Sequence, residues 1–252
     1  MDEARGDMMG SRLRRSHPVD KAAYERDVKR NEVFYRRNYL NHMPEDKTAP
    51  ILEIGCGLGQ FLSFCRACGY TSASGVDMST ENVAFCRERS LTATLSEGGE
   101  YLTRTSCTFG AIVMNDVIEH IPKDGVLPLL RRVLDRLQPG GVLIMKTINA
   151  ANPLLGPHGR YNDFTHELSW TEESMRQVLE GSGFVGIRVA PSNLYVFYAN
   201  PLNYIALAVA KLFELFFFLY FRLHGRVTTK IFTKNLIAVA RKPDEAGDKS
   251  PA

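Results

Sequence analysis

The chain has 252 residues, a formal net charge of +3 and 44% hydrophobic residues, which is an ordinary globular composition. This length suits one large α/β domain or two small ones, and so small a charge does not favour nucleic acid as a partner. The five cysteines lack the spacing of an extracellular disulfide framework, and the first residues contain no apolar signal segment. We therefore expect a protein of the reducing cytoplasm, whose oligomeric state the sequence leaves open.

The N-terminal region divides into a polar arm and a helix. Residues 1–19 are polar and contain three clustered arginines, so we expect a disordered basic arm. From Asp20 to Met43, aromatic and aliphatic residues recur at helical spacing. This helix either packs against a sheet or covers a ligand pocket as a lid, and both interpretations stay open. At the other end, residues 243–252 are predicted to be a polar tail.

Residues 51–60, Ile-Leu-Glu-Ile-Gly-Cys-Gly-Leu-Gly-Gln, predict a strand followed by a glycine-rich turn, and Phe61–Cys68 has helical spacing. A doubly wound α/β sheet builds a nucleotide site from this strand–turn–helix unit. Gln60 stands where a dinucleotide fingerprint has its third glycine. Glu53 would repel a pyrophosphate and suits a ligand that carries an amino group. The turn therefore favours a ligand other than a dinucleotide.

Strands and helices alternate through the rest of the chain. The expected strands are Pro50–Ile54, Ser72–Asp77, Thr92–Ser96, Phe109–Met114, Val142–Lys146, Phe184–Ala190 and Asn235–Arg241. The expected helices between them are Thr80–Arg89, Val126–Leu137 and Glu172–Glu180. Short connections in a β-α alternation predict one α/β domain over residues 20–242, with a doubly wound sheet and helices on both faces.

Three motifs carry a resemblance to a known family. The glycine turn with Asp77 further on resembles the first motif, E/D-x-G-x-G-x-G, of class I S-adenosylmethionine (SAM) methyltransferases. Residues 115–122 resemble the fourth-strand motif of that family, D-x-x-E-H-I/V, and the Leu-x-Pro-Gly-Gly turn at 137–141 is a third match. The resemblance covers about Pro50–Phe184 and, by position, Asn235–Arg241. It implies a Rossmann-like seven-stranded sheet with an antiparallel last strand, and S-adenosyl-L-methionine as the methyl donor.

The resemblance also implies a set of donor-binding residues: Glu53, Gly55, Cys56, Gly57, Gly59, Gln60, Asp77, Met78, Asn115 and Asp116. Asp77 would accept hydrogen bonds from the ribose hydroxyls, and a turn-capping aspartate is the alternative. The chain departs from the family at Gly98-Gly99, where an acidic residue usually holds the adenine. Either Glu97 or Glu100 takes that role, or the backbone alone contacts the adenine.

The long segment after the fifth strand predicts the acceptor side. Residues 147–170 are dense in groups that donate, accept and stack, and long loops at this edge of a sheet usually have a function. Transfer to an alcohol oxygen needs a base, so His166 is the first candidate, with Asp163 as its orienting partner or as the base. The remaining candidates are His158 for catalysis and Glu119, His120, Arg160 and Tyr161 for acceptor binding. For each residue alone, a hydrogen bond that braces the loop is the alternative.

Two similarities bear on the acceptor. The tract Arg160–Glu167 is similar to one in methyltransferases from bacterial glycan and lipopolysaccharide gene clusters. The stretch Asp116-x-x-Glu119-His120 is similar to one in ubiquinone-biosynthesis O-methyltransferases, where it is linked to a divalent metal. We expect a glycan or lipid-linked acceptor and no metal. The alternatives are a methyltransferase for a quinone or isoprenoid small molecule, and a non-catalytic scaffold with this fold.

Residues 191–234 form an insert between the last two strands. Leu202–Ala210 and Leu212–Phe221 make an apolar run interrupted by Lys211, with Glu214 inside it, and basic residues follow at 222–234. Because the chain must return to pair its last strand, we expect the insert to lie on one membrane face instead of crossing it. The expected partner is the inner face of the cytoplasmic membrane, contacted through residues 202–234. A subdomain buried on the sheet or in a dimer is the alternative.

Overall fold

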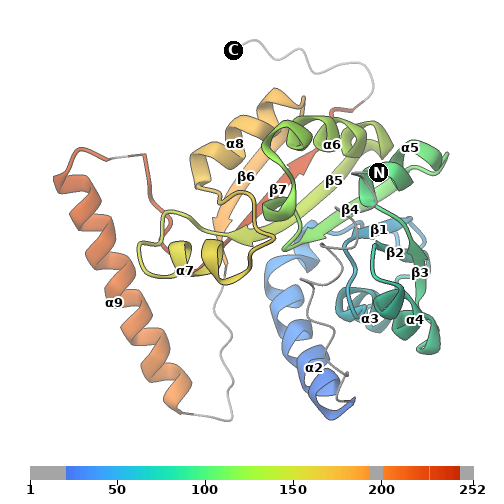
Figure 1. Ribbon diagram of the computed structural model, residues 1–252, viewed down its shortest axis with the longest axis horizontal. Helices are drawn as coiled ribbons and strands as arrows, with labels where there is room; N and C mark the ends of the chain where they lie inside the picture. The colour runs from blue at the N-terminus through green and yellow to red at the C-terminus, as the bar shows by residue number, and fades with distance from the viewer. Residues whose placement is uncertain (1–20, 193–200, 227, 245–252) are drawn as a thin grey trace, which may run out of the picture.

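The computed structural model describes residues 21–192, 201–226 and 228–244, so the predictions for residues 1–19 and for the tail beyond 244 lie outside the described residues. Seven strands form one sheet in the order β3-β2-β1-β4-β5-β7-β6 (Figure 1). The strands β1 to β5 are parallel, and β7 runs antiparallel between β5 and β6. The predicted Rossmann-like sheet with an antiparallel last strand is confirmed. The bounds are β1 (Ile51–Ile54), β2 (Ala73–Asp77), β3 (Thr92–Leu95), β4 (Phe109–Asn115), β5 (Leu137–Ile148), β6 (Val185–Pro191) and β7 (Asn235–Arg241).

Helices cover both faces of this sheet (Figure 1). The central strands β1 and β4 are apolar runs because they are buried on both faces, as parallel strands usually are. The helical bounds are α2 (Lys21–Asn38), η1 (Leu40–His42), α3 (Gln60–Ala67), α4 (Thr80–Glu88), α5 (Gly98–Arg104), η2 (Ile118–His120), α6 (Lys123–Arg136), α7 (Leu155–Asn162), α8 (Glu172–Gly181) and α9 (Leu202–Leu223).

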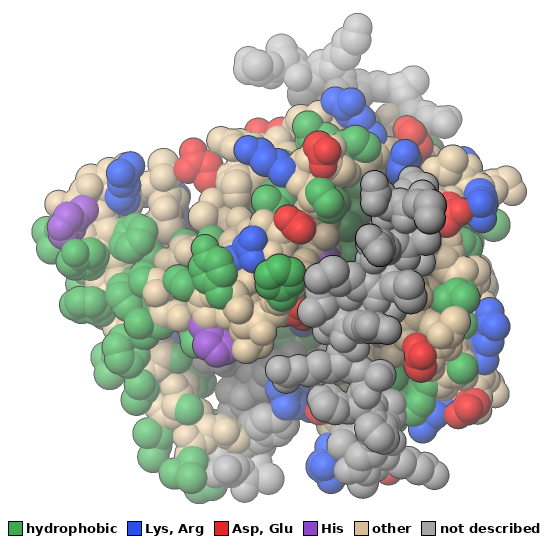
Figure 2. Space-filling model, in the orientation of Figure 1, with side chains coloured by type: hydrophobic (Ala, Val, Ile, Leu, Met, Phe, Trp, Pro, Cys, Tyr) green, Lys and Arg blue, Asp and Glu red, His purple; other side chains and the backbone are tan. Residues whose placement is uncertain are grey.

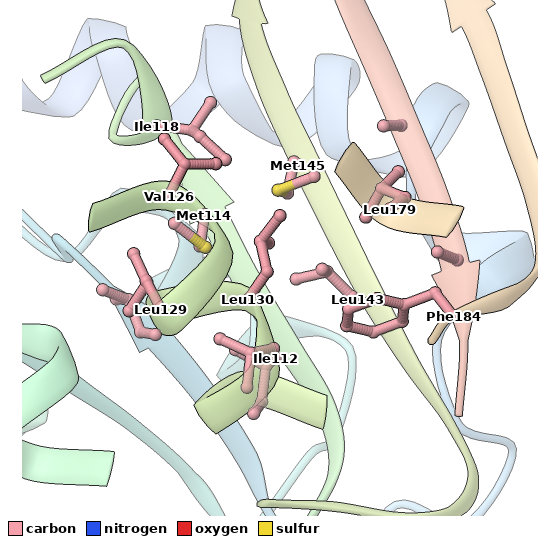
Figure 3. Packing of buried hydrophobic residues seen from close by; sticks show 14 of the residues in the cluster. Ile112, Met114, Ile118, Val126, Leu129, Leu130, Leu143, Met145, Leu179 and Phe184 are labelled. Atoms are coloured by element: carbon pink, nitrogen blue, oxygen red, sulfur yellow. The ribbon is translucent and has the colours of Figure 1, made fainter. Parts of the chain in front are cut away.

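The larger core cluster fills one face of the sheet (Figure 3). Alternate residues of β4 and β5, such as Ile112 and Leu143, meet Leu130 of α6 and Leu179 of α8. On the other face, an aromatic cluster joins the N-terminal helix to α3 through Phe34, Tyr35, Tyr39, Phe61 and Phe64. This packing fixes the carboxyl edge of β1 and β4, where a doubly wound sheet binds its ligands.

Two helices, α5 and α7, were not among the expected elements. Glu97 begins α5, because its carboxylate accepts hydrogen bonds from the backbone N–H groups of Gly99 (2.8 Å) and Glu100 (2.7 Å). A Cβ at Gly98 would overlap Ile54, so a glycine is required for close packing against β1. Glu97 therefore caps a helix here, and Glu100 forms an ion pair with Arg104 on the surface of α5. Strand β5 also begins earlier than expected, at Leu137, with an irregular register opposite Phe109 and Ala111.

The helix α9 lies outside the packed layers. It forms a single 22-residue helix where two apolar segments were noted, and Figure 1 shows it at the edge of the molecule, away from the sheet. Its most apolar 18-residue window has a mean hydropathy of 1.8 and is 0% buried. Figure 2 shows hydrophobic side chains along its length. By length and composition alone, this helix could cross a bilayer.

Candidate active site

The glycine turn after β1 combines left-handed backbone with one open position. Gly55, Gly57 and Gly59 have φ angles of 70°, 50° and 76°, which residues with a side chain rarely adopt. A Cβ at Gly59 would come within 2.6 Å of Leu91, whereas a Cβ at Gly57 would meet nothing within 4 Å. Gly59 therefore serves packing, and the space beside the Gly57 Cα is open to a ligand. Cys56, between the first two glycines, is buried.

Asp77 ties the end of β2 to this turn. One carboxylate oxygen accepts a hydrogen bond from the Gly57 backbone N–H at 2.8 Å. The other accepts from the Ser79 backbone N–H at 2.9 Å and from the Asn82 side chain at 3.2 Å. The turn-capping role is thus present in the structure, and the ribose contact stays a prediction. Gln60 at the start of α3 and the exposed Met78 after β2 border the same region.

A chain of three polar side chains connects β1, β4 and the N-terminal helix. Asn115 Nδ2 donates to Glu53 Oε1 at 2.9 Å, and the Tyr39 hydroxyl donates to Asn115 Oδ1 at 2.6 Å. Glu53 is 3% exposed, and this burial raises the pKa of its carboxyl well above the usual value. Its second oxygen, Oε2, is buried without a hydrogen-bond partner among the described residues. Such a carboxyl suits a ligand that brings an amino group.

The two interpretations of the N-terminal helix are both represented in the structure. The helix packs against α3 through its aromatic residues, as a covering helix of the sheet. Tyr39 at its end is 0% exposed and reaches Asn115 at the carboxyl edge. The helix therefore supports the donor side directly, and movement as a lid stays a prediction.

The stretch after β4 does not form a single donor set for a metal. Asp116 has a φ of 53° and pairs with Lys146 of β5 at 2.5 Å. Glu119 is 0% exposed and accepts a hydrogen bond from Thr147 Oγ1 at 3.0 Å, which is the bracing role that we gave as its alternative. Its contact with the acceptor stays a prediction. Burial, and secondarily the nearby Asp116, raises the pKa of Glu119 to about 8. In residues 21–192, 201–226 and 228–244, no group of three His, Cys, Asp or Glu is arranged to hold a metal ion.

The structure brings two imidazoles together on the acceptor side. The rings of His120 and His166 have centroids 4.5 Å apart. His166 Nδ1 lies 2.7 Å from the carbonyl oxygen of Gly159. A carbonyl can only accept, so Nδ1 carries the hydrogen and Nε2 of neutral His166 holds the lone pair. Asp163 accepts from Thr165 at 2.7 Å, a bond different from the direct pairing with His166 that we expected.

The other acceptor-side candidates are more exposed. Arg160 donates to the Glu167 carbonyl at 3.0 Å and lies over the Tyr161 ring. Tyr161 is 80% exposed, and His158 on α7 is also exposed. These three residues belong to the helix α7 and do not form a buried cluster.

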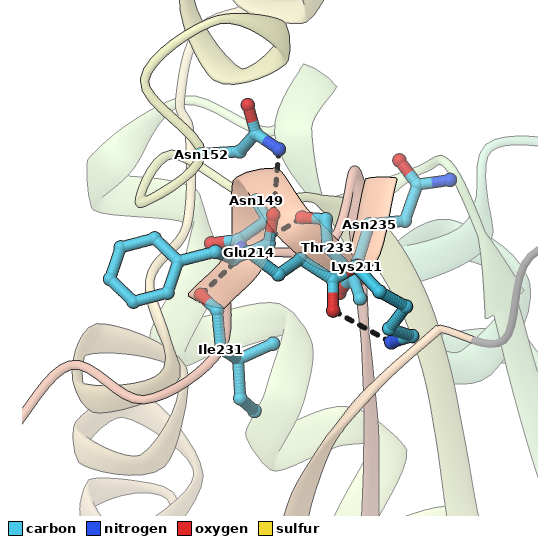
Figure 4. Close-up of polar contacts among 8 residues, drawn as sticks. Asn149, Asn152, Lys211, Glu214, Ile231, Thr233 and Asn235 are labelled. Carbon is cyan, nitrogen blue, oxygen red and sulfur yellow. Dashed lines mark hydrogen bonds and ion pairs between the residues drawn. The ribbon is translucent and has the colours of Figure 1, made fainter. Parts of the chain in front are cut away.

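Two asparagines that the sequence analysis passed over hold the acceptor side together (Figure 4). Asn149 donates to the carbonyls of Ile231 and Thr233, both at 2.9 Å. Asn152 donates to the Phe232 carbonyl at 2.7 Å and accepts from the first N–H groups of α7. An Asn-x-x-Asn-Pro tract directly after a strand is a turn signal that could have indicated this role. The pair binds the segment returning from α9 to the start of α7.

A cavity in the described part of the chain lies away from these groups. It measures about 810 Å³ and is lined mainly by the segment between η1 and β1 and by residues 138–142. These residues lie at the amino ends of the parallel strands, opposite the glycine turn. We therefore place the active site at the carboxyl edge, where this fold binds ligands.

The sequence profile of a family described as a methyltransferase domain matches residues 24–189. A SAM-dependent methyltransferase from Archaeoglobus fulgidus has a similar structure, with a TM-score of 0.63 and 18% identity over 85% of this chain and 94% of that one. A phosphoethanolamine N-methyltransferase 2 from Haemonchus contortus has a TM-score of 0.58 and 16% identity, over 86% of this chain and 57% of that one. A possible histamine N-methyltransferase from Thermotoga maritima has a TM-score of 0.57 and 14% identity, over 88% of this chain and 95% of that one. No curated protein matches in sequence.

The fold, the glycine turn and the carboxyl edge define a class I SAM-dependent methyltransferase. The chain belongs to the methyltransferase-domain family, whose profile covers most of its length. S-adenosylmethionine is its methyl donor, and when bound it supplies an electrophilic methyl group on a sulfonium. The open space beside Gly57 and the Glu53 oxygen that has no hydrogen-bond partner in the described part of the chain fit such a ligand. The contacts of single residues with the donor stay predictions.

Proposed function

We propose that this enzyme transfers a methyl group from SAM to an oxygen of a glycan or lipid-linked acceptor at the cytoplasmic face of a membrane. The observation that carries the proposal is the exposed apolar helix α9, attached directly to the acceptor side of the site. The proposal combines three features: a base suited to a hydroxyl, aromatic surface beside it, and a helix suited to lipid.

The base is an imidazole of the acceptor side. The tautomer of His166, fixed by Gly159, presents a lone pair on Nε2 that can take a proton from a hydroxyl as the oxygen attacks. Tyr161 and Phe164 beside it are 80% and 85% exposed. Exposed rings of this kind offer an apolar face for a sugar ring or a lipid chain. Together they favour an alcohol oxygen on a bulky amphipathic acceptor.

The surface of α9 suits a lipid bilayer. Large apolar side chains are exposed on several sides, including Leu202, Ile205, Leu212, Phe216 and Leu223. Lys211 and Glu214, the two charges inside the helix, form an ion pair at 2.7 Å (Figure 4). The basic residues Arg222, Arg226, Lys230 and Lys234 follow at the C-terminal end. Each basic residue near an anionic surface adds about 1 kcal/mol to binding.

An interfacial position suits α9 better than a crossing. The chain returns from α9 to β7, which pairs with β5 and β6 in the same sheet. The described part of the return segment between α9 and β7 is not helical, and unpaired backbone is not tolerated in hydrocarbon. A helix lying in the membrane interface lets the chain return to β7 on the same side and keeps the non-helical return segment at the headgroups.

The attachment of α9 to the acceptor side supports a lipid-linked acceptor. The rings of Phe217 and Phe221 contact Phe232, with centroids 6.3 and 4.9 Å apart. Asn152 holds the Phe232 carbonyl and also the start of α7. Because α7 leads into the His166 loop, a membrane contact of α9 brings the acceptor side to the lipid surface.

Flotation with vesicles tests the membrane part of this proposal. The full chain is mixed with vesicles of phosphatidylcholine and phosphatidylglycerol, and with vesicles of phosphatidylcholine alone. We expect flotation with the anionic vesicles and its loss in the variant Leu212→Ser/Phe216→Ser/Leu219→Ser. The matched control, Leu95→Ser/Val185→Ser, changes two apolar residues of similar exposure elsewhere and should float normally.

The chemical part has a separate readout. Radiolabelled SAM is incubated with the protein and with membranes from cells that lack it, and the lipid and glycan fractions are counted. Label in an alkali-stable ether of a lipid-linked glycan supports the proposal. Label in an isoprenoid quinone, lost on treatment with a chelator, would support the quinone alternative instead. If the protein remains in the soluble fraction and light scattering shows an α9-dependent dimer, the membrane proposal is wrong.

A further inference from the structure

In the hydrogen-bond network around His120, the chemistry of the groups determines which atom donates and which accepts. Thr165 Oγ1 lies 2.7 Å from Asp163 Oδ1 and 2.9 Å from His120 Nδ1. Hydrogen bonds from Thr165 lower the pKa of Asp163, so this carboxylate is an anion at neutral pH and can only accept. The single hydroxyl hydrogen of Thr165 is therefore directed to Asp163, where the bond is charge-assisted.

This direction fixes the tautomer of His120. With its hydrogen given to Asp163, Thr165 Oγ1 accepts a hydrogen bond, and His120 Nδ1 is the donor. A second contact agrees, because His120 Nδ1 also lies 3.3 Å from the carbonyl oxygen of Thr165, which can only accept. In neutral His120 the lone pair is consequently on Nε2. The chain of contacts runs from His120 through Thr165 to the Asp163 anion.

We propose that His120 is a second catalytic imidazole, which shares with His166 the proton that leaves the acceptor hydroxyl, and that Thr165 and Asp163 are its positioning residues. This inference rests on the proposed transfer to an oxygen. It adds to that proposal the site of the proton and a role for Asp163 through Thr165.

The bond changes balance without any further reactant. The acceptor O–H bond breaks and its proton moves to the imidazole pair, while an O–CH₃ bond forms. The S–CH₃ bond breaks, and its electron pair stays on sulfur as a neutral thioether. The positive charge of the sulfonium thus moves to an imidazolium, which afterwards releases its proton to water. The Asp163 anion, two hydrogen bonds from His120, stabilises that charge where it arrives.

The surrounding charges favour one proton on the pair. Two imidazolium rings with centroids 4.5 Å apart would repel each other. His166 is bonded to a neutral carbonyl, whereas His120 is connected through Thr165 to the Asp163 anion, so the anion that faces the arriving positive charge lies on the His120 side. Two charged groups next to His120 in the sequence have partners of their own, since Asp116 pairs with Lys146 and the buried Glu119 accepts from Thr147.

The tautomer can be measured without any acceptor. Protein carrying ¹⁵N-labelled histidine is studied by long-range ¹H–¹⁵N NMR, with His120→Gln used to assign the signals. We expect neutral His120 to carry its hydrogen on Nδ1. Thr165→Val removes the hydroxyl at nearly constant volume and leaves only the longer contact with the carbonyl of residue 165, so the tautomer population should shift partly toward Nε2–H. Thr165→Ser keeps the hydroxyl and should preserve the wild-type spectrum. Neutral His120 with its hydrogen on Nε2 in the wild type would overturn the proposal.

The kinetic test uses the methyl-transfer assay with membranes described above. We expect Thr165→Val to reduce the rate about tenfold and Thr165→Ser to stay within about twofold of wild type. Asp163→Asn keeps an acceptor for Thr165 and removes the charge, so the acidic limb of its pH–rate profile should move to lower pH by about one unit. The proposed roles of Thr165 and Asp163 are contradicted if the acidic limb of the pH–rate profile does not move in Asp163→Asn. They are also contradicted if Thr165→Val and wild type have equal rates. Absence of label in any oxygen acceptor, with the expected NMR result, would count against the proposed function alone.

Discussion

The donor and acceptor sides of this site are built in different ways. On the donor side, the functional groups stand at the ends of buried strands, and Glu53 and Asn115 bond to each other across two of them. On the acceptor side, they stand on α7 and its following loop, held by side chains that bond to backbone carbonyls. Tyr161 and Phe164 there are 80% and 85% exposed, and the aromatic contacts of α9 with Phe232 lie in its C-terminal half, at Phe217 and Phe221. A rigid sheet edge suits one fixed donor, and attached segments suit a bulky acceptor.

Replacing His166 should have the largest effect, a loss of methyl-transfer rate without a loss of SAM affinity. The variant His166→Gln removes the Nε2 lone pair that we propose takes the proton of the acceptor hydroxyl, so we expect a rate lower by about 10²–10⁴. SAM affinity, measured by calorimetry, should stay unchanged because the described contacts of this ring are with Gly159 and His120, which are outside the predicted donor set. His42→Gln, at the opposite edge of the sheet, is the matched control. An equal loss of SAM affinity in His166→Gln would mean that the two sides are not separable.

A change at Asp77 should instead lower the affinity for SAM. Its carboxylate orders the Gly57 backbone and is the predicted ribose contact, and hydrogen bonds to a charged group contribute about 1.5–3 kcal/mol each. Asp77→Ala should therefore weaken SAM binding about tenfold to a hundredfold in a calorimetric titration. The control Asp46→Ala removes an exposed carboxylate that also caps a turn. Unchanged affinity in Asp77→Ala would remove the residue from the predicted donor set.

A smaller effect is expected where the N-terminal helix meets the donor side. Tyr39→Phe deletes the hydroxyl that donates to Asn115 and leaves the ring packed against Phe61. The loss of one hydrogen bond of about 0.5–1.5 kcal/mol should weaken SAM binding roughly two- to tenfold. Tyr70→Phe is a matched control, because its hydroxyl bonds to the Pro44 carbonyl far from the site. Equal affinities for the two variants would limit the helix to a packing role.

The same contrast explains how far the sequence was informative. The strand ends and the glycine turn are local patterns, so Glu53, Gly57, Asp77 and Asn115 could be placed at one edge before the structure was known. The contact between Asn149 and Ile231 joins residues 82 positions apart through a backbone carbonyl, which no residue type announces. The start of α5 was missed because Gly98-Gly99 is a poor helix former and only the capping Glu97 indicates it.

The smallest expected effect concerns stability, and it lies at the boundary between the two sides. Glu119 separates the donor strand from the acceptor loop, and its burial raises its pKa to about 8 in the folded state. A carboxyl whose folded pKa exceeds its unfolded value near 4.3 stabilises the fold while it is protonated, and this contribution declines as the pH rises from about 4.3 to 8. The melting temperature should therefore fall across that range by on the order of several degrees more than in Glu119→Gln.

Glutamine is the informative replacement because it resembles the protonated acid and can still accept from Thr147. If the pKa is raised as described, Glu119→Gln flattens the pH dependence of the melting temperature and is the more stable protein near pH 8. The exposed Glu100→Gln should leave the wild-type slope in place. Parallel melting curves for wild type and Glu119→Gln would show that Glu119 stays ionised in the fold. The acceptor loop, bonded to the Glu119 carbonyl at residues 167 and 168, would then be supported by a buried charge.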